Sequence, residues 1–243
     1  MNISNMIFRL LPAVLAVLMQ LSLPARAGSL QVAPVSIDVF APRAASSVTI
    51  RNSGKQTMTL QARIFEWKQK KSRDSYYKTR KVVVSPPMLK LRPGQSGIIR
   101  IVRLSKTPLQ AEESYRLIVD ELPRLQKARR STVTMVIRHS IPVYFSGNNV
   151  ETKAPTWTIA KKNRHLRVTA INKGDVRVKL SRLTLKDASG NKILSDKGLN
   201  GYILGHSKRS FLVKTKNRFS GSHVRLSANS NVGTIQTNIK ISK

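Results

Sequence analysis

The chain has 243 residues, a length that suits one large domain or two ordinary ones. It contains no cysteine, which excludes disulfide-stapled scaffolds, thiol catalysis and thiolate metal sites. The 44 lysine and arginine residues against 11 acidic ones give a formal net charge of +33. Such a charge attracts polyanions or acidic protein surfaces, but it does not determine a fold.

Residues 1–27 have the pattern of a secretory signal. Arg9 precedes an apolar run from Leu10 to Leu23, and Pro24 and the small-residue triplet Ala25-Arg26-Ala27 follow it. This pattern predicts export and cleavage before Gly28. The run is shorter than the roughly 20 apolar residues of a membrane span, so no transmembrane anchor is expected.

The first half of the chain then reads as a series of short β-strands. Turn signals separate the strands at Asn52-Ser53-Gly54, Ser85-Pro86-Pro87 and Arg92-Pro93-Gly94. The expected strands, rich in β-branched or apolar residues, are Leu30 to Phe40, Ser47 to Asn52, Met58 to Trp67, Val82 to Val84, Gly97 to Leu104 and Tyr115 to Glu121. Short strands at this spacing predict a β-sandwich.

The stretch Ser131 to Phe145 alternates small or polar residues with apolar ones, which predicts a long strand. The apolar side chains on one side belong to Val133, Met135, Ile137, Ile141 and Val143. On this period alone, the strand either has one face in its own core or runs past its sheet and offers that face to a partner.

A polar segment after Phe145, SGNNVETKAP, is the best candidate for a linker. It places the domain boundaries at residues 28–147 and 148–243. The expected strands of the second half are Trp157 to Ala160, Leu166 to Asn172, Val176 to Leu185, Tyr202 to Leu204, Ser210 to Lys214, His223 to Ala228 and Thr234 to Ile241. The fold class is therefore all-β, with two β-sandwich domains in tandem.

No constellation of residues points to catalysis or to a cofactor. The four histidines lack the spacing of a metal site, no serine lies in a nucleophile elbow, and Glu112 and Glu113 are adjacent, so in a strand they point to opposite faces. Trp67 and Trp157 fit core or interdomain packing. We therefore expect no enzyme activity, no metal, no cofactor and no specific nucleic-acid recognition.

Landmarks of the first half occur in a fixed order. They are Val84-Ser85-Pro86-Pro87, then Leu91-Arg92-Pro93-Gly94-Gln95 before Ile99-Arg100-Ile101, then Glu113-Ser114-Tyr115-Arg116-Leu117 with Glu121-Leu122-Pro123, and finally Ile141-Pro142-Val143-Tyr144-Phe145. Together they resemble the periplasmic pilus and fimbrial assembly chaperones of the PapD-like superfamily. The second half is more loosely similar to that family's C-terminal domain, through Ala170 to Gly174 and Gly201 to Leu204.

The resemblance implies a boomerang of two immunoglobulin-like domains in the periplasm. In this family the chaperone inserts a long strand into a groove of a pilus subunit that lacks its final strand, and it delivers the subunit to an outer-membrane usher. On this chain the donor residues would be Val133, Met135, Ile137 and Ile141. The implied partners are pilus or coat subunits and an usher, and self-association of the subunit-free chain is an open alternative.

This chain differs from the best-known branch of the family in the residues expected to bind the subunit's C-terminus. The best-known branch of the family holds the subunit's terminal carboxylate with a basic pair, and this chain has Ser36 and Pro142 at those positions. The Ser140-Ile141-Pro142 pattern and the run Glu113 to Leu117 are similar to the archaic, spore-coat-U-associated branch.

A carboxylate is best held by a fixed guanidinium. The candidate anchors are Arg100, Arg138 and Arg116, in a different place from the usual pair. Each of them is alternatively an ion pair of the fold with Glu113 or Asp120. The competing function is a cationic immunoglobulin-like envelope protein that binds polyanions without chaperone activity.

Overall fold

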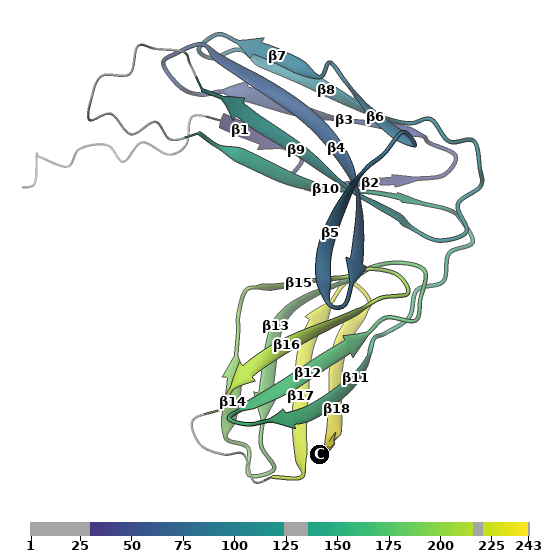
Figure 1. The fold of residues 1–243 in the computed structure, drawn as a ribbon, viewed down its shortest axis with the longest axis vertical. Coiled ribbons are helices and arrows are strands. Elements are labelled where there is room, and N and C mark those ends of the chain that lie inside the picture. Colours follow the sequence, from purple (N-terminus) through teal and green to yellow (C-terminus); the bar gives the residue numbers. More distant parts are fainter. Residues whose placement is uncertain (1–29, 124–135, 216–220, 243) are drawn as a thin grey trace, which may run out of the picture.

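The computed structural model describes residues 30–123, 136–215 and 221–242. All regular structure in these ranges is β, arranged as two sandwiches that meet at an angle (Figure 1). The predicted all-β fold with two tandem immunoglobulin-like domains in a boomerang is confirmed.

The N-terminal sandwich packs two sheets against each other. The first has the order β1-β3-β8-β6, with β1 at Leu30–Ala33, β3 at Ala45–Asn52, β8 at Ser96–Arg103 and β6 at Val82–Ser85. The second has the order β2-β10-β9-β4-β5, with β2 at Ile37–Phe40, β10 at Arg138–Ser146, β9 at Glu113–Leu122, β4 at Met58–Lys70 and β5 at Arg73–Lys78, and β7 at Met88–Leu91 also pairs with β4.

The segment predicted as one strand from Leu30 to Phe40 forms two strands in different sheets. β1 pairs with β3, whereas β2 pairs in parallel with β10. Pro34 lies at the break, where its missing N–H cannot continue a ladder. The chain therefore crosses from one sheet to the other here and places β2 beside β10.

Alternation along the strands accounts for the core of the first sandwich. On β8, Ile99 and Ile101 are fully buried, while Ile98 and Arg100 point outward. Val48 on β3 joins the same core. Each such aliphatic side chain contributes about 1.5–3 kcal/mol through removal from water.

The C-terminal sandwich follows after Ser146. Its strands are β11 (Thr156–Lys162), β12 (His165–Ile171), β13 (Val178–Lys186), β14 (Lys192–Ser195), β15 (Leu199–Ile203), β16 (Lys208–Lys214), β17 (His223–Ser230) and β18 (Gly233–Ser242). They run in the order β14-β13-β17-β18-β11-β12-β16, and β15 pairs with β13. A separate buried cluster that includes Leu166, Leu180 and Leu226 forms the second core.

The β4–β5 hairpin is longer than its sandwich requires. It projects out of the N-terminal sandwich and reaches the C-terminal one (Figure 1). At its turn, Ser72 Oγ lies 3.3 Å from Ser210 Oγ on β16. The hairpin therefore connects the two domains in addition to the chain link.

Candidate functional site

The strand β10 has one edge that is only half covered. β10 pairs with β9 from Arg138 opposite Asp120 to Phe145 opposite Glu113, which leaves only its last residue, Ser146, unpaired on this side. On its other edge β2 covers only the second half, beginning with Val143 opposite Ile37. Within the described ranges, no strand pairs with this edge of β10 at residues 138–142, so the edge is open to an added strand.

The candidate donor residues lie in different environments. Val133 and Met135 fall outside the residues that the structure describes. Ile137 is half-buried, and its carbonyl accepts a hydrogen bond from the backbone N–H of Glu121 at 2.9 Å, so pairing with β9 extends to this position.

Ile141 requires a correction. It is 3% exposed and packs in the core of its own sandwich. Ile141 shares its side of the strand with Val143, and within the sheet this side is covered by the opposite sheet. Ile141 is therefore a core residue of the domain and has no free surface to offer to a partner.

An aromatic cluster fills the junction of the two domains. Trp67 of β4 and Tyr144 of β10 pack against Tyr202 and Leu204 of the C-terminal domain. The ring of Trp67 meets Tyr202 edge-on, with 5.7 Å between centroids. The expectation that Trp67 serves core or interdomain packing is therefore met, because it packs across the interdomain boundary.

Arg116 lies on β9 beside this cluster. Its guanidinium carbon is 3.9 Å from the Trp67 ring centroid and 5.9 Å from that of Tyr202. Its Nη1 donates a long bond of 3.5 Å to the carbonyl of Ser140 on β10. Its Nε is buried without a hydrogen-bond partner among the described residues. No described carboxylate forms an ion pair with Arg116, so its fixed cation is open to an anion from outside the described chain.

Arg138, the second candidate anchor, is instead occupied by an ion pair of the fold. Its Nε lies 2.5 Å from Asp120 Oδ1, and Arg63 approaches the other oxygen of the same carboxylate. The hydrogen bond from Arg138, supported by Arg63, lowers the pKa of Asp120. The ion-pair alternative therefore describes Arg138 in this structure.

Arg100, the third candidate anchor, lies on the other sheet of the N-terminal sandwich. It lies on β8, where its neighbours in register are Ser47 and Ser85. It alternates with the buried Ile99 and Ile101, so its side chain points away from the core on the outer face of the first sheet. Because Arg116 and Arg138 lie on the second sheet, the sandwich separates Arg100 from them.

Arg177 was not anticipated from the sequence. Its guanidinium forms ion pairs with Glu112 and Asp38 of the N-terminal domain and stacks on Tyr144 at 3.4 Å from the ring centroid. The Glu112 side chain is fully buried. Burial raises the pKa of Glu112, and Arg177 opposes this shift. Arg177 therefore fixes the C-terminal domain against the first.

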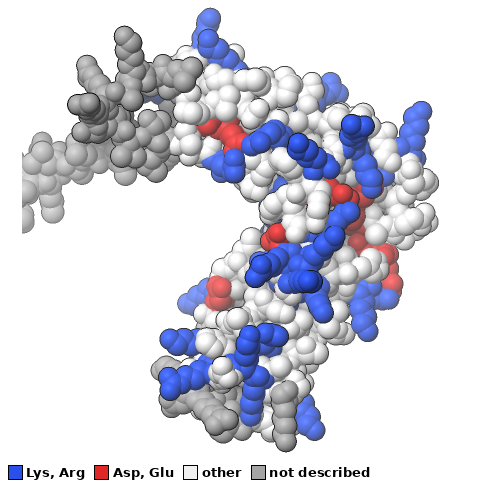
Figure 2. Space-filling view, in the orientation of Figure 1, with Lys and Arg blue, Asp and Glu red and all other residues white. Residues whose placement is uncertain are grey.

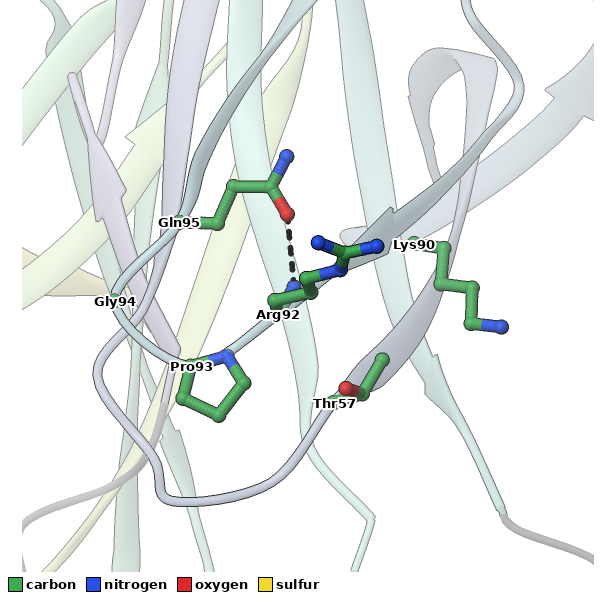
Figure 3. A pocket seen from close by; sticks show the side chains of 6 residues that line it. All are labelled: Thr57, Lys90, Arg92, Pro93, Gly94 and Gln95. Carbon is green, nitrogen blue, oxygen red and sulfur yellow. Dashed lines mark hydrogen bonds between the residues drawn. The ribbon is translucent and has the colours of Figure 1, made fainter.

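A surface depression lies away from this junction. It has a volume of about 770 Å³ and is lined by Thr57, Lys90, Arg92, Pro93, Gly94 and Gln95 (Figure 3). Gly94 has a φ of 75°, and the carbonyl of Arg92 accepts a hydrogen bond from the Gln95 N–H, as expected for a Pro-Gly turn. The carbonyl of Asn52 accepts a hydrogen bond from the N–H of Gly94, so the turn is tied to the end of β3 and has a structural role.

Two further classes of site are not found in the described parts of the chain. No group of three or more His, Asp or Glu side chains is placed there to hold a metal ion. None of the described residues forms a helix that could span a membrane.

Comparison with known proteins identifies the family. Residues 29–151 match the family model described as the pili and flagellar-assembly chaperone, PapD N-terminal domain. No curated protein matches the sequence.

Solved structures of chaperones share the fold over most of the chain. One belongs to the CsuC–CsuE chaperone–tip adhesion subunit pre-assembly complex from archaic chaperone-usher Csu pili of Acinetobacter baumannii, with 24% identity, a TM-score of 0.67 and coverage of 89% of this chain and 100% of that one. The E. coli chaperone DraB matches with 18% identity and a TM-score of 0.55 over 88% and 98% of the two chains.

The CupB2 chaperone of Pseudomonas aeruginosa matches with 13% identity and a TM-score of 0.56 over 87% and 100%. These structures share both sandwiches with this protein, and the family model covers its N-terminal one. The chain therefore belongs to the PapD-like family of pilus assembly chaperones.

Proposed function

We propose that this chaperone acts in the periplasm, where it holds pilus or spore-coat-U-like subunits by donor-strand complementation and delivers them to an outer-membrane usher. The single observation that carries the proposal is the edge of β10 at residues 138–142, which no described strand covers and which lies next to Arg116, an arginine without a carboxylate partner in the described ranges. A subunit strand that pairs with this edge would satisfy backbone groups on both chains.

The orientation of β2 supports a site for a chain terminus. β2 runs parallel to β10 and begins at Ile37, opposite Val143. A subunit strand with the same direction would lie in line with β2, and its last residue would stop beside Ser36. Its terminal carboxylate would then come close to Pro142 and Arg116, which are opposite each other in register.

We therefore assign Arg116 as the proposed anchor of the subunit's carboxylate. In the best-known branch a lysine stands at the position of Pro142, so the anchoring cation of this chain is displaced by one strand. A guanidinium that is already stacked on Trp67 loses little side-chain entropy on binding. Arg138 is a weaker candidate because Asp120 already neutralises it.

The donor side chains of the proposal are Val133, Met135 and Ile137. Each would contribute about 1.5–3 kcal/mol if it were fully buried in a subunit groove, before the costs of association. Val136, which precedes β10, is 52% exposed. The similarity to the complex from the archaic Csu pili favours the spore-coat-U-associated branch.

The experiment is co-expression with candidate pilus subunits, followed by a pull-down. The double substitution Met135→Asp with Ile137→Asp is expected to abolish subunit recovery while leaving the chaperone folded. Leu212→Asp is the matched control, because Leu212 is 61% exposed on the edge strand β16 of the other domain. Undiminished subunit recovery with the double variant would contradict donor-strand binding.

A second candidate function, polyanion binding, is favoured by the net charge of +33. Figure 2 shows Lys and Arg over both domains and around their junction, with far fewer Asp and Glu. Binding of this kind is expected to disappear by about 0.5 M salt through counterion release, and not to depend on Met135 or Ile137. Salt-resistant complexes that need these two residues would exclude it as the main function.

A further inference from the structure

Gln69 lies near the end of β4, on the part of the hairpin that reaches the C-terminal domain (Figure 1). Its Nε2 donates hydrogen bonds to the Tyr202 carbonyl at 2.9 Å and to Asp74 Oδ1 at 3.0 Å. Its Oε1 accepts from the Leu204 N–H at 3.0 Å and from Ser207 Oγ at 2.9 Å. Both N–H groups and both lone pairs of this amide are therefore used.

The geometry of these bonds resembles strand pairing. A residue in a parallel β-ladder bonds the carbonyl of one residue and the N–H of another two positions along the neighbouring strand. The Gln69 side-chain amide does the same with Tyr202 and Leu204. It therefore acts as an extra peptide group that fixes the backbone on both sides of Ile203, a fully buried residue of the C-terminal core.

This backbone carries the ring that completes the surroundings of Arg116. Tyr202 belongs to the C-terminal domain, yet its ring lies 5.7 Å from that of Trp67 and 5.9 Å from the Arg116 guanidinium. Gln69 and Trp67 are two residues apart on β4. This one strand therefore supplies both the ring that packs against Tyr202 and the amide that bonds the Tyr202 backbone. The position of Tyr202 over Arg116 therefore depends on where the Gln69 amide places the C-terminal domain.

We propose that Gln69 is a positioning residue for the carboxylate site at Arg116, and that Tyr202 makes the C-terminal domain part of this site. The inference rests on the proposed function, because it concerns the same anchor. Two aromatic rings beside the guanidinium fix its plane and exclude water from it. A carboxylate that binds to this guanidinium therefore meets a preorganised cation in a less polar environment.

The test follows the Arg116 Nε–H signal by NMR in the nitrogen-labelled protein. The probe is acetate, the smallest analogue of a terminal carboxylate, and acetamide is its neutral control. In the unaltered protein, acetate and not acetamide is expected to shift this signal. With Gln69→Ala, the ring-current shift of the free protein decreases and acetate binds roughly fivefold more weakly, as loss of one cation–π contact implies.

Two variants complete the test. Tyr202→Leu is expected to reproduce the effect of Gln69→Ala without touching the hairpin, which keeps the inference testable if the Gln69 variant folds poorly. Gln236→Ala is the matched control, since Gln236 is exposed on β18 of the C-terminal sheet. This control is expected to leave the signal and the acetate response unchanged.

The outcomes separate the two proposals. If acetate shifts the Arg116 signal equally in the unaltered protein and in Gln69→Ala, with unchanged ring-current shifts, the positioning role is wrong while the anchor stands. If acetate has no effect on Arg116 even in the unaltered protein, the anchor itself is wrong and the inference falls with it.

Discussion

Arg177 of the C-terminal domain stacks on Tyr144 of the N-terminal domain, with its guanidinium carbon 3.4 Å from the ring centroid. The same guanidinium bonds Glu112, whose side chain is fully buried. The domain junction thus contains a cation, an anion and an aromatic ring that are removed from water together. The stability of each domain depends on the other through this contact.

Replacement of Arg177 by alanine is expected to destabilise the protein by about 3–5 kcal/mol, because it leaves the Glu112 carboxylate buried without its partner. Urea unfolding at neutral pH measures the loss. Arg225→Ala is the control, since Arg225 is exposed on β17. Addition of Glu112→Gln to the Arg177 variant should restore part of the stability, and an equal loss in the double variant would contradict this account.

The environment of Glu113 predicts that the stability of the protein depends on pH. Burial raises its pKa, but hydrogen bonds from Arg103 and Tyr115 prevail, so the pKa is lowered overall. This stabilisation is present above the unfolded pKa of about 4.3 and is lost as the pH falls through the lower folded value. Glu113→Gln should therefore cost about 1–3 kcal/mol at neutral pH.

The stability difference between Glu113→Gln and the unaltered protein should shrink as the pH falls below about 4, when the unaltered carboxylate also becomes protonated. Urea unfolding over a series of pH values checks this. Glu151→Gln is the control, because the Glu151 side chain is 59% exposed and pairs only with exposed Lys153 among the described residues. A difference that grows toward acid pH would show that the sign is wrong.

Alanine substitutions of Arg138 and of Arg116 should have different effects on subunit recovery. Arg138 is 65% exposed, so Arg138→Ala is expected to leave both the free energy of unfolding and subunit recovery nearly unchanged. Arg116→Ala should reduce recovery strongly. Arg116→Lys should restore it only in part, because an ammonium lacks the planar stack on Trp67. If Arg138→Ala had the larger effect on recovery, the roles assigned to these two arginines would be reversed.

Gly205 is a site of close backbone approach. A Cβ placed there would lie 2.3 Å from the carbonyl oxygen of Asp175. Gly205→Ala is therefore expected to cost about 1–3 kcal/mol of stability through overpacking. Gly198→Ala is the control, because the nearest atom that its added Cβ would meet is a side-chain oxygen of Asp196 at 3.4 Å. Thermal unfolding of the two variants should show a clear decrease in melting temperature only for Gly205→Ala.

The parts of the fold that could be predicted from the sequence are those with a local signal. The run Gly97 to Leu104 alternates, and the structure has β8 at Ser96–Arg103. β5 was missed because the run Arg73 to Lys78 is polar or exposed throughout. Its pairing partner is the extension of β4, so its strand conformation comes from a neighbour and not from its own pattern.

The candidate site was only partly predictable, for a related reason. Arg177 meets Glu112 and Asp38 across 65 and 139 positions of sequence, and no local pattern reports such contacts. Alternation gave the correct side for Ile141. It did not show at which residue this side of the strand stops facing the domain's own core and becomes available to a partner. This point depends on where the opposite sheet ends.

The start of β2 at Ile37 has a further consequence for any strand that binds in line with it. The position of its last residue would set the register of the incoming strand, since β2 blocks further movement along β10. One extra residue at the end of that strand would move each of its side chains to the opposite face. Under the proposed function, the chaperone would therefore read the length of a subunit's C-terminal segment, and it would reject subunits that carry an added C-terminal tag.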